Sequence, residues 1–245
     1  MKKNIKIYIE KDYAAVSLKA CDIFANRVRT HPTEAFGFAT GQTPVGLYKE
    51  LVKLSDGSKI DMTQIKAFNL DEYYPIKASD SQSYAYFMAV NLFDAVKLPI
   101  ENRNIPSGEA TDAIEECKLY EDKISKSGGI KLQILGIGNN GHIGFNEPDD
   151  VFSGETNFVK LADDTVIANS RFFESIDMVP KHAITMGIHT IMMAEEVLLI
   201  ATGETKANIL RDALLGPITP KVPASVLQLH RNVSVVTDQK AGQLL

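Results

Sequence analysis

The stretch from Gly136 to Pro148 contains residue types that could move protons, and it reads Gly-Ile-Gly-Asn-Asn-Gly-His-Ile-Gly-Phe-Asn-Glu-Pro. His142 is followed five residues later by Glu147, around a turn that the Asn-Glu-Pro sequence indicates. A carboxylate near an imidazole favours one ring tautomer and supports proton transfer. The loop is too rich in glycine and polar residues to be core, so we expect a substrate to approach both the imidazole and the backbone beside it.

The glycines of this loop have a second interpretation, which the sequence excludes. Gly136, Gly138 and Gly141 match the G-x-G-x-x-G pattern of dinucleotide-binding loops and follow an apolar run. However, no helix pattern begins at the third glycine, and no acidic residue closes a second strand about 20 residues later. We therefore expect these glycines to bind substrate, as positions where the backbone passes close to a ligand or takes a positive φ.

Two loops have the composition of anion sites. In Thr40-Gly41-Gln42-Thr43-Pro44 an apolar strand leads into a helix, with Thr43 expected as the N-cap and Pro44 as the first helical residue. Residues 201–206 repeat this arrangement, and Lys206 there opposes the helix dipole unless an anion compensates. Two such loops at one sheet edge suggest a shared phosphate, although a capped helix without a ligand is the alternative for each. Neither is a Walker A loop, so a nucleoside triphosphate is not expected.

Two further charged residues are candidates. Asp71 is the first polar residue after the apolar run that ends at Leu70. If it is partly desolvated, its pKa rises and it can act as a base near neutral pH; a solvated strand-end aspartate is the alternative. Arg171 is a candidate phosphate ligand, with an ordinary surface arginine as the alternative. A phosphate site, a carboxylate base and an imidazole together indicate proton transfer on a sugar phosphate.

Composition and spacing exclude other classes of function. The net charge of -5 and the lack of a Lys/Arg run argue against nucleic-acid binding, and no apolar segment is long enough to span a membrane. The histidines outside the loop lack ligand spacing, and no nucleophile elbow is present, so we expect no metal and no acyl chemistry. Cys21 and Cys117 are expected as core thiols. The N-terminal residues lack a signal peptide's apolar core, which predicts a cytoplasmic location.

The elements that must position these residues follow an alternating pattern, which predicts an α/β fold with a mainly parallel sheet covered by helices. We expect one domain over residues 1–245, with an irregular insert near 149–180 that could close as a lid. Ligands bind at the carboxyl ends of such strands, at the loops 40–44, 71–75, 136–148 and 203–206. The predicted strands are 5–10, 35–40, 65–70, 132–137, 183–187, 197–202 and 233–238, and the predicted helices begin near Asp12, Pro44, Ser83, Asp112 and Thr205.

These motifs, in order along the chain, resemble the glucosamine-6-phosphate deaminase family. The resemblance rests on residues 40–44, 68–73, 81–84, 136–148, 168–173 and 195–197, and it extends from about residue 35 to residue 230. The Gly-His-Ile-Gly-Phe-Asn-Glu-Pro string also distinguishes this family from 6-phosphogluconolactonases, whose loop continues differently after Gly-His.

The resemblance implies a Rossmann-like three-layer fold and a reaction that converts glucosamine 6-phosphate and water to fructose 6-phosphate and ammonia without a cofactor. It implies that Asp71 moves the C2 proton and that His142, oriented by Glu147, assists ring opening. Asn140 is expected as a further catalytic residue, although it occupies a position where some members have aspartate, and Gln42 occupies one where a small residue is frequent. The residues implied to hold the phosphate are Thr40, Gly41, Gln42, Thr43, Arg171 and Lys206.

Allosterically activated members of the family are expected to hold an effector phosphate with basic residues in a Ser-Arg-Thr-Arg-like string. The corresponding residues 153–159 lack both arginines and contain Glu155. We therefore expect no effector site, and we favour a monomer slightly over a homo-oligomer. Two alternatives remain open: an enzyme that acts on another hexose phosphate, either an amino-sugar phosphate epimer or a lactone, and a sugar-phosphate sensor without turnover.

Overall fold

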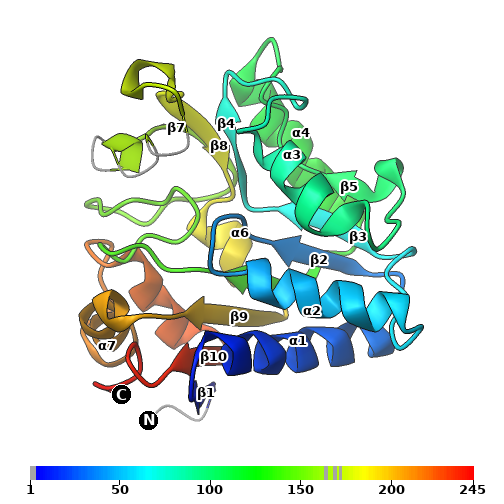
Figure 1. Cartoon of the computed structure of the whole chain (residues 1–245). Helices are drawn as coiled ribbons and strands as arrows, with labels where there is room; N and C mark the ends of the chain where they lie inside the picture. Colours follow the sequence, from blue (N-terminus) through cyan, green and yellow to red (C-terminus); the bar gives the residue numbers. More distant parts are fainter. Residues whose placement is uncertain (1–3, 163–164, 168–169, 171–172) are drawn as a thin grey trace.

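The computed structural model describes residues 4–162, 165–167, 170 and 173–245, and its central element is a seven-stranded parallel sheet (Figure 1). The strand order is β1-β10-β9-β6-β2-β3-β5. The inner strands of this sheet are mostly buried on both faces, which explains why their sequences are largely apolar runs, whereas the edge strands β1 and β5 are partly exposed. The bounds are β1 Ile5–Glu10, β2 Ala35–Phe38, β3 Lys66–Asn69, β5 Arg103–Asn104, β6 Ile130–Leu135, β9 Glu196–Ala201 and β10 Val233–Asp238.

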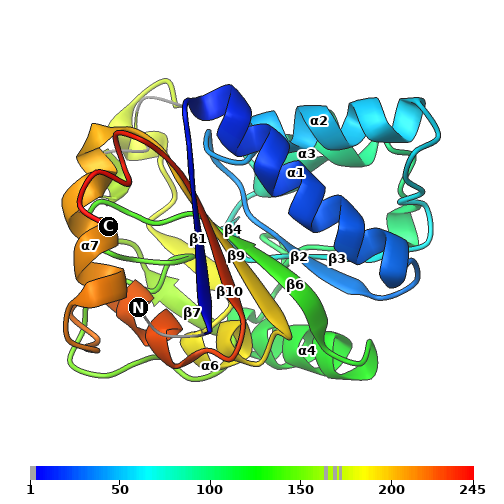
Figure 2. The ribbon, with the colours of Figure 1, turned by 90° about the horizontal axis from the view of Figure 1, so that it is seen from below.

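Helices cover both faces of this sheet (Figure 2). On one face lie α1 (Tyr13–Thr30), α2 (Val45–Asp56) and α3 (Tyr84–Met88), which continues into the π-helical turn η1 (Ala89–Phe93). On the other lie α4 (Ala113–Lys126) and α6 (Ile188–Met192). The chain is completed by α7 (Ala207–Leu215) and the short helices η2 Ile100–Asn102, η4 Ile176–Met178, η5 Glu204–Lys206 and η6 Pro223–Leu229. The predicted three-layer α/β fold is thus confirmed.

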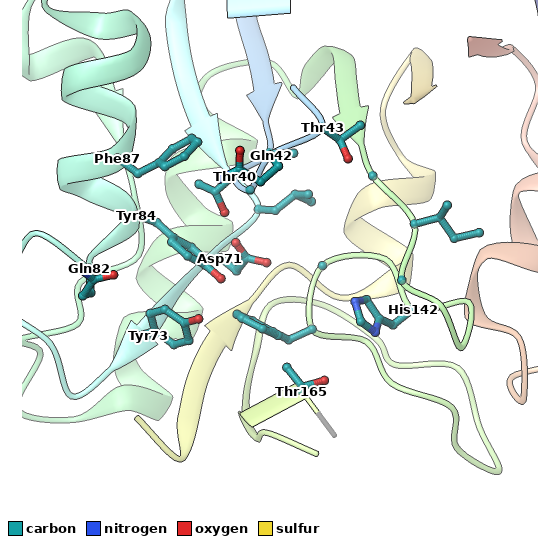
Figure 3. Close-up of a pocket in the computed structure, with 18 of the residues that line it drawn as sticks. Thr40, Gln42, Thr43, Asp71, Tyr73, Gln82, Tyr84, Phe87, His142 and Thr165 are labelled. Carbon is teal, nitrogen blue, oxygen red and sulfur yellow. The ribbon is translucent and has the colours of Figure 1, made fainter. Parts of the chain in front are cut away.

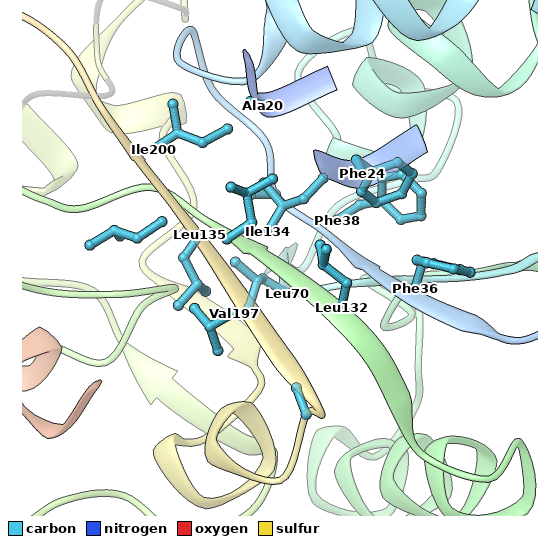
Figure 4. Packing of buried hydrophobic residues seen from close by; sticks show 14 of the residues in the cluster. Ala20, Phe24, Phe36, Phe38, Leu70, Leu132, Ile134, Leu135, Val197 and Ile200 are labelled. Carbon is cyan, nitrogen blue, oxygen red and sulfur yellow. The ribbon is translucent and has the colours of Figure 1, made fainter. Parts of the chain in front are cut away.

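Aromatic side chains pack on β2 and β3 from opposite sides of the sheet, and Figure 4 shows the three rings on the α1 side, Phe24, Phe36 and Phe38. Phe36 and Phe38 both contact Phe24 of α1, with ring centroids 5.2 and 5.4 Å apart. On the opposite face Phe68 of β3 packs edge-on against Tyr120 of α4. Side chains alternate along a strand, so the spacing Phe-Gly-Phe in β2 places both rings on the α1 side. This packing fixes the positions of β2 and β3. It therefore also positions the candidate site residues, which lie in the segments that follow these two strands.

A second, three-stranded antiparallel sheet is the main feature that sequence analysis missed. It has the order β4-β8-β7, with β4 Asp71–Tyr74, β8 His182–Thr185 and β7 Asn157–Lys160. Residues 71–75, expected as a loop, are therefore mostly strand, because the chain leaves the large sheet at Leu70 and pairs with β8. The insert expected to be irregular contributes β7. Whether its remaining residues act as a lid stays a prediction.

Several local predictions can be compared directly with the structure. Asp12 and Asp112 cap α1 and α4, as expected, by accepting backbone N–H groups of the first turn. Thr43 was wrong as a cap, because α2 begins after Pro44 without a side-chain cap hydrogen bond. Cys21 and Cys117 are both buried free thiols. Among the described residues, no helix is both long and apolar enough to cross a membrane.

Candidate active site

A cavity of about 750 Å³ opens at the carboxyl ends of β2, β3, β6 and β9 (Figure 3). This is the edge of the sheet where the sequence predicted ligand binding. The predicted residues that line the cavity are Thr40, Gly41, Gln42, Thr43, Asp71, Gly136, Gly138, Asn140, His142 and Lys206. Glu147 and Gly141 do not line it, although both contact residues that do. Arg171 lies outside the described residues.

The loop after β2 presents backbone to the cavity. Gly41 has φ +90°, and a Cβ built on it meets no atom within 4 Å, so the loop leaves open space where a side chain would otherwise stand. Tyr13 of α1 braces the loop from outside: its hydroxyl accepts the Gly46 N–H at 2.8 Å and lies 3.1 Å from the Gln42 carbonyl. Tyr13 was missed by sequence analysis, because a tyrosine at the start of a helix 29 residues away carries no signal of this contact.

The loop after β9 contributes less than expected. Its Gly203 N–H does not face an anion but donates to the carboxylate of Asp238, at 2.9 Å to Oδ2. Only Lys206 of this loop lines the cavity, and its Nζ donates to Asn139 Oδ1 at 2.6 Å. Desolvation lowers the pKa of Lys206. The two loops are therefore not equivalent: the loop after β2 offers its backbone to an anion, whereas the loop after β9 offers only the side chain of Lys206.

Asp71 lies at the cavity wall, at the start of β4. Its side chain is almost fully buried, with 6% of the residue exposed. Burial raises the pKa of Asp71 to about 8, and the charge of the adjacent Glu72 adds to the rise. The alternative of a solvated strand-end aspartate is thus wrong. An acid with this pKa exchanges protons readily near neutral pH, as a general base must.

The loop after β6 holds the imidazole over a glycine. A Cβ built on Gly138 would lie 2.3 Å from Cε1 of His142, so any other residue there would collide with the ring. The Gly138 N–H donates to the His142 carbonyl at 2.9 Å, which closes the loop on itself. No helix follows, in agreement with the rejection of a dinucleotide site. Position 138 therefore requires glycine for a steric reason, because the imidazole of His142, the candidate catalytic group, occupies the space that a side chain would need.

Glu147 is the centre of the polar contacts around His142. Its Oε2 lies 3.3 Å from His142 Nδ1, without the alignment of a good hydrogen bond, and accepts Asn140 Nδ2 at 2.6 Å. Its Oε1 accepts the Thr165 hydroxyl at 2.5 Å. Burial by itself raises the pKa of Glu147, but His142, Thr165 and Asn140 together outweigh it and lower the pKa to about 2. Glu147 is therefore a fixed negative charge beside the imidazole.

Two anchors hold this loop next to Asp71. The Phe145 N–H donates to the hydroxyl of Thr185, which pairs with Asp71 across β8 and β4. Asn146 is buried, and its amide donates to the carbonyls of Ile143 and Met186 at 2.7 and 2.8 Å. The asparagine of the Asn-Glu-Pro turn is thus structural. It fixes the loop to the small sheet, which brings the imidazole loop and the buried carboxyl to one cavity.

Aromatic rings form a wall that sequence analysis did not predict as part of the site. Tyr73, Tyr84, Phe145 and Phe173 come from four separate segments and all line the cavity. The rings of Tyr84 and Phe145 are stacked at 6.1 Å, and Tyr73 contacts both, with centroids 4.8 and 5.8 Å away. Such a wall lowers the local dielectric constant and explains the desolvation of Asp71. Each of the four rings lies in a motif that carried the family resemblance, but nothing in the spacing of these motifs predicted that the rings meet.

The assembled groups fit chemistry that moves protons within an anionic, polar ligand. Lys206, Gly41, Asp71 and His142 all line the same cavity. A buried carboxyl and an imidazole at one cavity can exchange protons with different atoms of the same ligand. In the part of the chain that the structure describes, no three His, Cys, Asp or Glu side chains are grouped to hold a metal ion.

Comparison with known proteins identifies relatives along nearly the whole chain. The family model described as glucosamine-6-phosphate isomerases/6-phosphogluconolactonase matches residues 11–236. A glucosamine-6-phosphate deaminase of Clostridium botulinum is 46% identical over 241 residues, which cover 98% of this chain and 97% of that protein. One of Lachnoclostridium phytofermentans is 48% identical over 232 residues, which cover 95% and 98%.

Solved structures agree with these relatives. A monomeric glucosamine-6-phosphate deaminase superposes with a TM-score of 0.95 at 39% identity, covering 98% of this chain and all of that one. A 6-phosphogluconolactonase from Thermotoga maritima superposes with a TM-score of 0.75 at 20% identity, covering 96% of this chain and 99% of that one. The second likeness concerns the fold alone, whereas the first extends to the sequence.

Proposed function

The chain belongs to the family of glucosamine-6-phosphate isomerases and 6-phosphogluconolactonases, and from this membership we propose how its cavity carries out the deaminase reaction. In that reaction glucosamine 6-phosphate and water give fructose 6-phosphate and ammonia. The deaminase branch is favoured over the lactonase branch because the deaminases named above are 39–48% identical to this chain, whereas the lactonase structure is 20% identical.

The phosphate binds between the loop after β2 and Lys206. Backbone N–H groups of residues 41–43 and the ammonium of Lys206 are donors that suit a phosphate dianion. Thr40, Gln42 and Thr43 add side-chain groups at the same loop. We retain Arg171 as a further phosphate ligand, on the basis of its match to the family motif. These contacts bind substrate and transition state alike, so they orient the sugar for chemistry at C1 and C2.

Ring opening is assigned to His142. The closed pyranose hides the C1 aldehyde, so the C1 hydroxyl must lose a proton, the bond from C1 to the ring oxygen must break, and that oxygen must gain a proton. An imidazole can carry the proton between the two oxygens. Glu147, held ionised by Asn140 and Thr165, supports the imidazole when it carries positive charge.

Isomerisation is assigned to Asp71. The C2 hydrogen of the open chain is acidic because C1 is now a carbonyl carbon. Asp71 removes this proton while the C1 oxygen gains one, which gives an enolamine, and a proton returned to C1 then gives the protonated C2 imine of fructose 6-phosphate. Water then adds to C2, and the C2–N bond breaks with release of ammonia. The observation that supports this role most is the burial of Asp71 at the wall of the cavity that His142 also lines.

The test is a direct assay of both products. Purified protein is incubated with glucosamine 6-phosphate, and ammonia and fructose 6-phosphate are each measured by coupled enzymes. Equal amounts of the two are expected. Parallel reactions contain galactosamine 6-phosphate or 6-phosphogluconolactone, which test the two enzymatic alternatives. If a folded preparation binds glucosamine 6-phosphate but releases neither product, the protein is a sugar-phosphate sensor and not an enzyme.

Oligomeric state and location are proposals of the same kind. We expect a monomer, supported by the TM-score of 0.95 to a deaminase described as monomeric. Analytical ultracentrifugation at several concentrations tests this directly, with sedimentation at the mass of one 26.9 kDa chain as the expected result. We also expect the enzyme to act in the cytoplasm, where sugar phosphates are metabolised.

A further inference from the structure

Glu72, the neighbour of Asp71 on β4, is almost completely buried, with 2% of the residue exposed. Successive side chains of a strand point to opposite faces, so Asp71 and Tyr73 line the cavity whereas Glu72 does not. A carboxylate this deeply buried is costly unless hydrogen-bond donors compensate it. The hydrogen-bond partners of Glu72 therefore indicate its role.

The partners of Glu72 are three backbone N–H groups. Oε1 accepts from Tyr73 and Tyr84, and Oε2 accepts from Ala85, each at 2.9 Å. Tyr84 and Ala85 are the first two residues of α3, whose N-terminal N–H groups have no partner within the helix. The next N–H, of Tyr86, goes to the Ser83 hydroxyl. Glu72 thus joins β4 to the start of α3.

The segment that Glu72 holds is one wall of the site. Ser83, Tyr84 and Phe87 line the cavity together with Asp71. Tyr84 packs on Tyr73 and Phe145, so its position depends on where α3 begins. A shift of this turn would move an aromatic ring against the reacting part of a bound ligand, and displacements of about 1 Å can cost roughly 100-fold in rate.

We propose that Glu72 is a positioning residue for the reaction assigned to Asp71, because its carboxylate anchors the Tyr84 wall to β4 and places a second negative charge directly behind Asp71. This inference rests on the proposed function. Glu72 does not touch the substrate, and it acts through Asp71 and α3.

The charges around Glu72 give this role a dependence on pH. The titratable groups that interact electrostatically with Glu72 are Asp71 and Tyr73 on β4, Tyr84 on α3, and Asp80 in the preceding loop. Burial raises the pKa of Glu72 to about 7, against the effect of its three backbone donors, and Asp80 adds to the rise. Ionised Glu72 in turn helps to raise the pKa of Asp71, after burial. The charge of Glu72 thus opposes the ionisation of Asp71.

The experiment compares Glu72→Gln with the wild type over the full pH range of kcat/KM for glucosamine 6-phosphate. Glutamine keeps the shape, but its amide nitrogen cannot accept the Ala85 N–H, and it carries no charge. We expect kcat to fall at least about tenfold, because the wall is displaced. We also expect the acidic limb of the profile to move to lower pH by about half a unit or more, because Asp71 loses a neighbouring charge.

The matched control is Glu116→Gln. Glu116 is also buried and accepts a backbone N–H, that of Ser107 at 2.9 Å, but it does not line the cavity. This variant should change the melting temperature without moving the acidic limb. If Glu72→Gln matches it, with an unmoved limb and wild-type kcat, the inference is overturned.

A second variant, Glu72→Asp, keeps the negative charge, but its shorter side chain cannot reach the N–H groups of α3 in the same way. It tests the anchoring role of Glu72 if the glutamine variant does not fold. A reduced kcat with an unmoved acidic limb is expected, whereas wild-type kcat would contradict the anchoring role. Failure of the proposed function is seen separately, as the absence of ammonia release by the wild type.

Discussion

Oε2 of Glu147 lies 3.3 Å from Nδ1 of His142. The same oxygen accepts the amide of Asn140, at the position where the sequence resemblance leads us to expect aspartate in some members of the family. An aspartate there would place two carboxylates in contact, whereas the amide donates to Glu147 and helps to keep it ionised. The departure from the family pattern is thus compatible with a negatively charged partner for the imidazole.

Replacing Glu147 by Gln tests this partnership. Glutamine retains the shape but removes the charge that supports a protonated His142. We expect kcat to fall by about 10² or more, within the range for loss of acid–base assistance, with a smaller change in KM. Steady-state kinetics with glucosamine 6-phosphate measure both constants, and Glu196→Gln is a control at the start of β9, outside the cavity. A variant with wild-type kcat would remove Glu147 from the proton relay.

Asp71→Asn tests the proposed base. The amide is isosteric but cannot accept the C2 proton, so we expect at least about a 10²-fold loss of kcat while substrate binding is nearly retained. Ammonia release measures turnover, and calorimetric titration with glucosamine 6-phosphate measures binding. In the wild type, kcat/KM should decline as pH falls below about 8, because protonated Asp71 is inactive. A variant within tenfold of the wild type would mean that another group takes the proton.

The same substitution should change the dependence of stability on pH. The pKa of Asp71 is raised from its ordinary 3.8 to about 8, so folding favours the neutral carboxyl. The contribution of the neutral Asp71 carboxyl to the free energy of unfolding is complete below pH 3.8. It is lost as the pH rises to about 8, where the buried group ionises. Asp71→Asn removes that loss, so its melting temperature relative to the wild type should increase from pH 5 to pH 9. Equal curves would show that Asp71 is solvated.

Lys206→Met tests the phosphate site. A charge-assisted contact contributes roughly 1.5–3 kcal/mol, so KM should rise by about 10- to 150-fold with a smaller effect on kcat. Inorganic phosphate should also become a weaker competitive inhibitor. Lys221→Met is the control, because the exposed Lys221 pairs with Asp150 outside the cavity. If both lysine variants retain the wild-type KM, the phosphate binds elsewhere.

Tyr13→Phe tests the brace behind the loop after β2. The variant removes the hydroxyl that accepts the Gly46 N–H, while the ring remains. A neutral hydrogen bond contributes about 0.5–1.5 kcal/mol, so we expect KM to rise about 2- to 12-fold. Tyr8→Phe in β1 provides a control for loss of a hydroxyl elsewhere. Identical kinetics for the two variants would show that the loop holds its shape without Tyr13.

Residues 153–160 bear on regulation. The Ser153 hydroxyl already has two hydrogen-bond partners within the fold, because it donates to Asn146 and accepts the Ile188 N–H. The exposed charges in this segment are Glu155 and Lys160, and a single exposed lysine binds a phosphate weakly. We expect hyperbolic kinetics and no activation by N-acetylglucosamine 6-phosphate. Sigmoidal rates that become hyperbolic with that sugar would place an effector site on other residues.

The sequence predicted every strand of the large sheet except β5, and several residues that line the cavity, because their signals are local. Buried parallel strands are continuous apolar runs, and capping aspartates mark helix starts, so the order of elements was predictable. His142, Asp71 and Lys206 were identified because polar groups at the carboxyl ends of such strands face a common edge. The distinctive order of motifs then indicated the family.

The tertiary structure decided what depends on contacts between distant segments. The chain leaves the large sheet at Leu70 and pairs with β8 more than 100 residues later, and no local pattern in Asp71–Tyr74 specifies that partner. Burial of Asp71, and therefore its raised pKa, results from this pairing and from rings contributed by separate segments. The brace by Tyr13, the turn of Gly203 toward Asp238 and the anchoring of α3 by Glu72 arise in the same way. Hydrogen bonds of this kind depend on positions in space, which spacing along the chain does not determine.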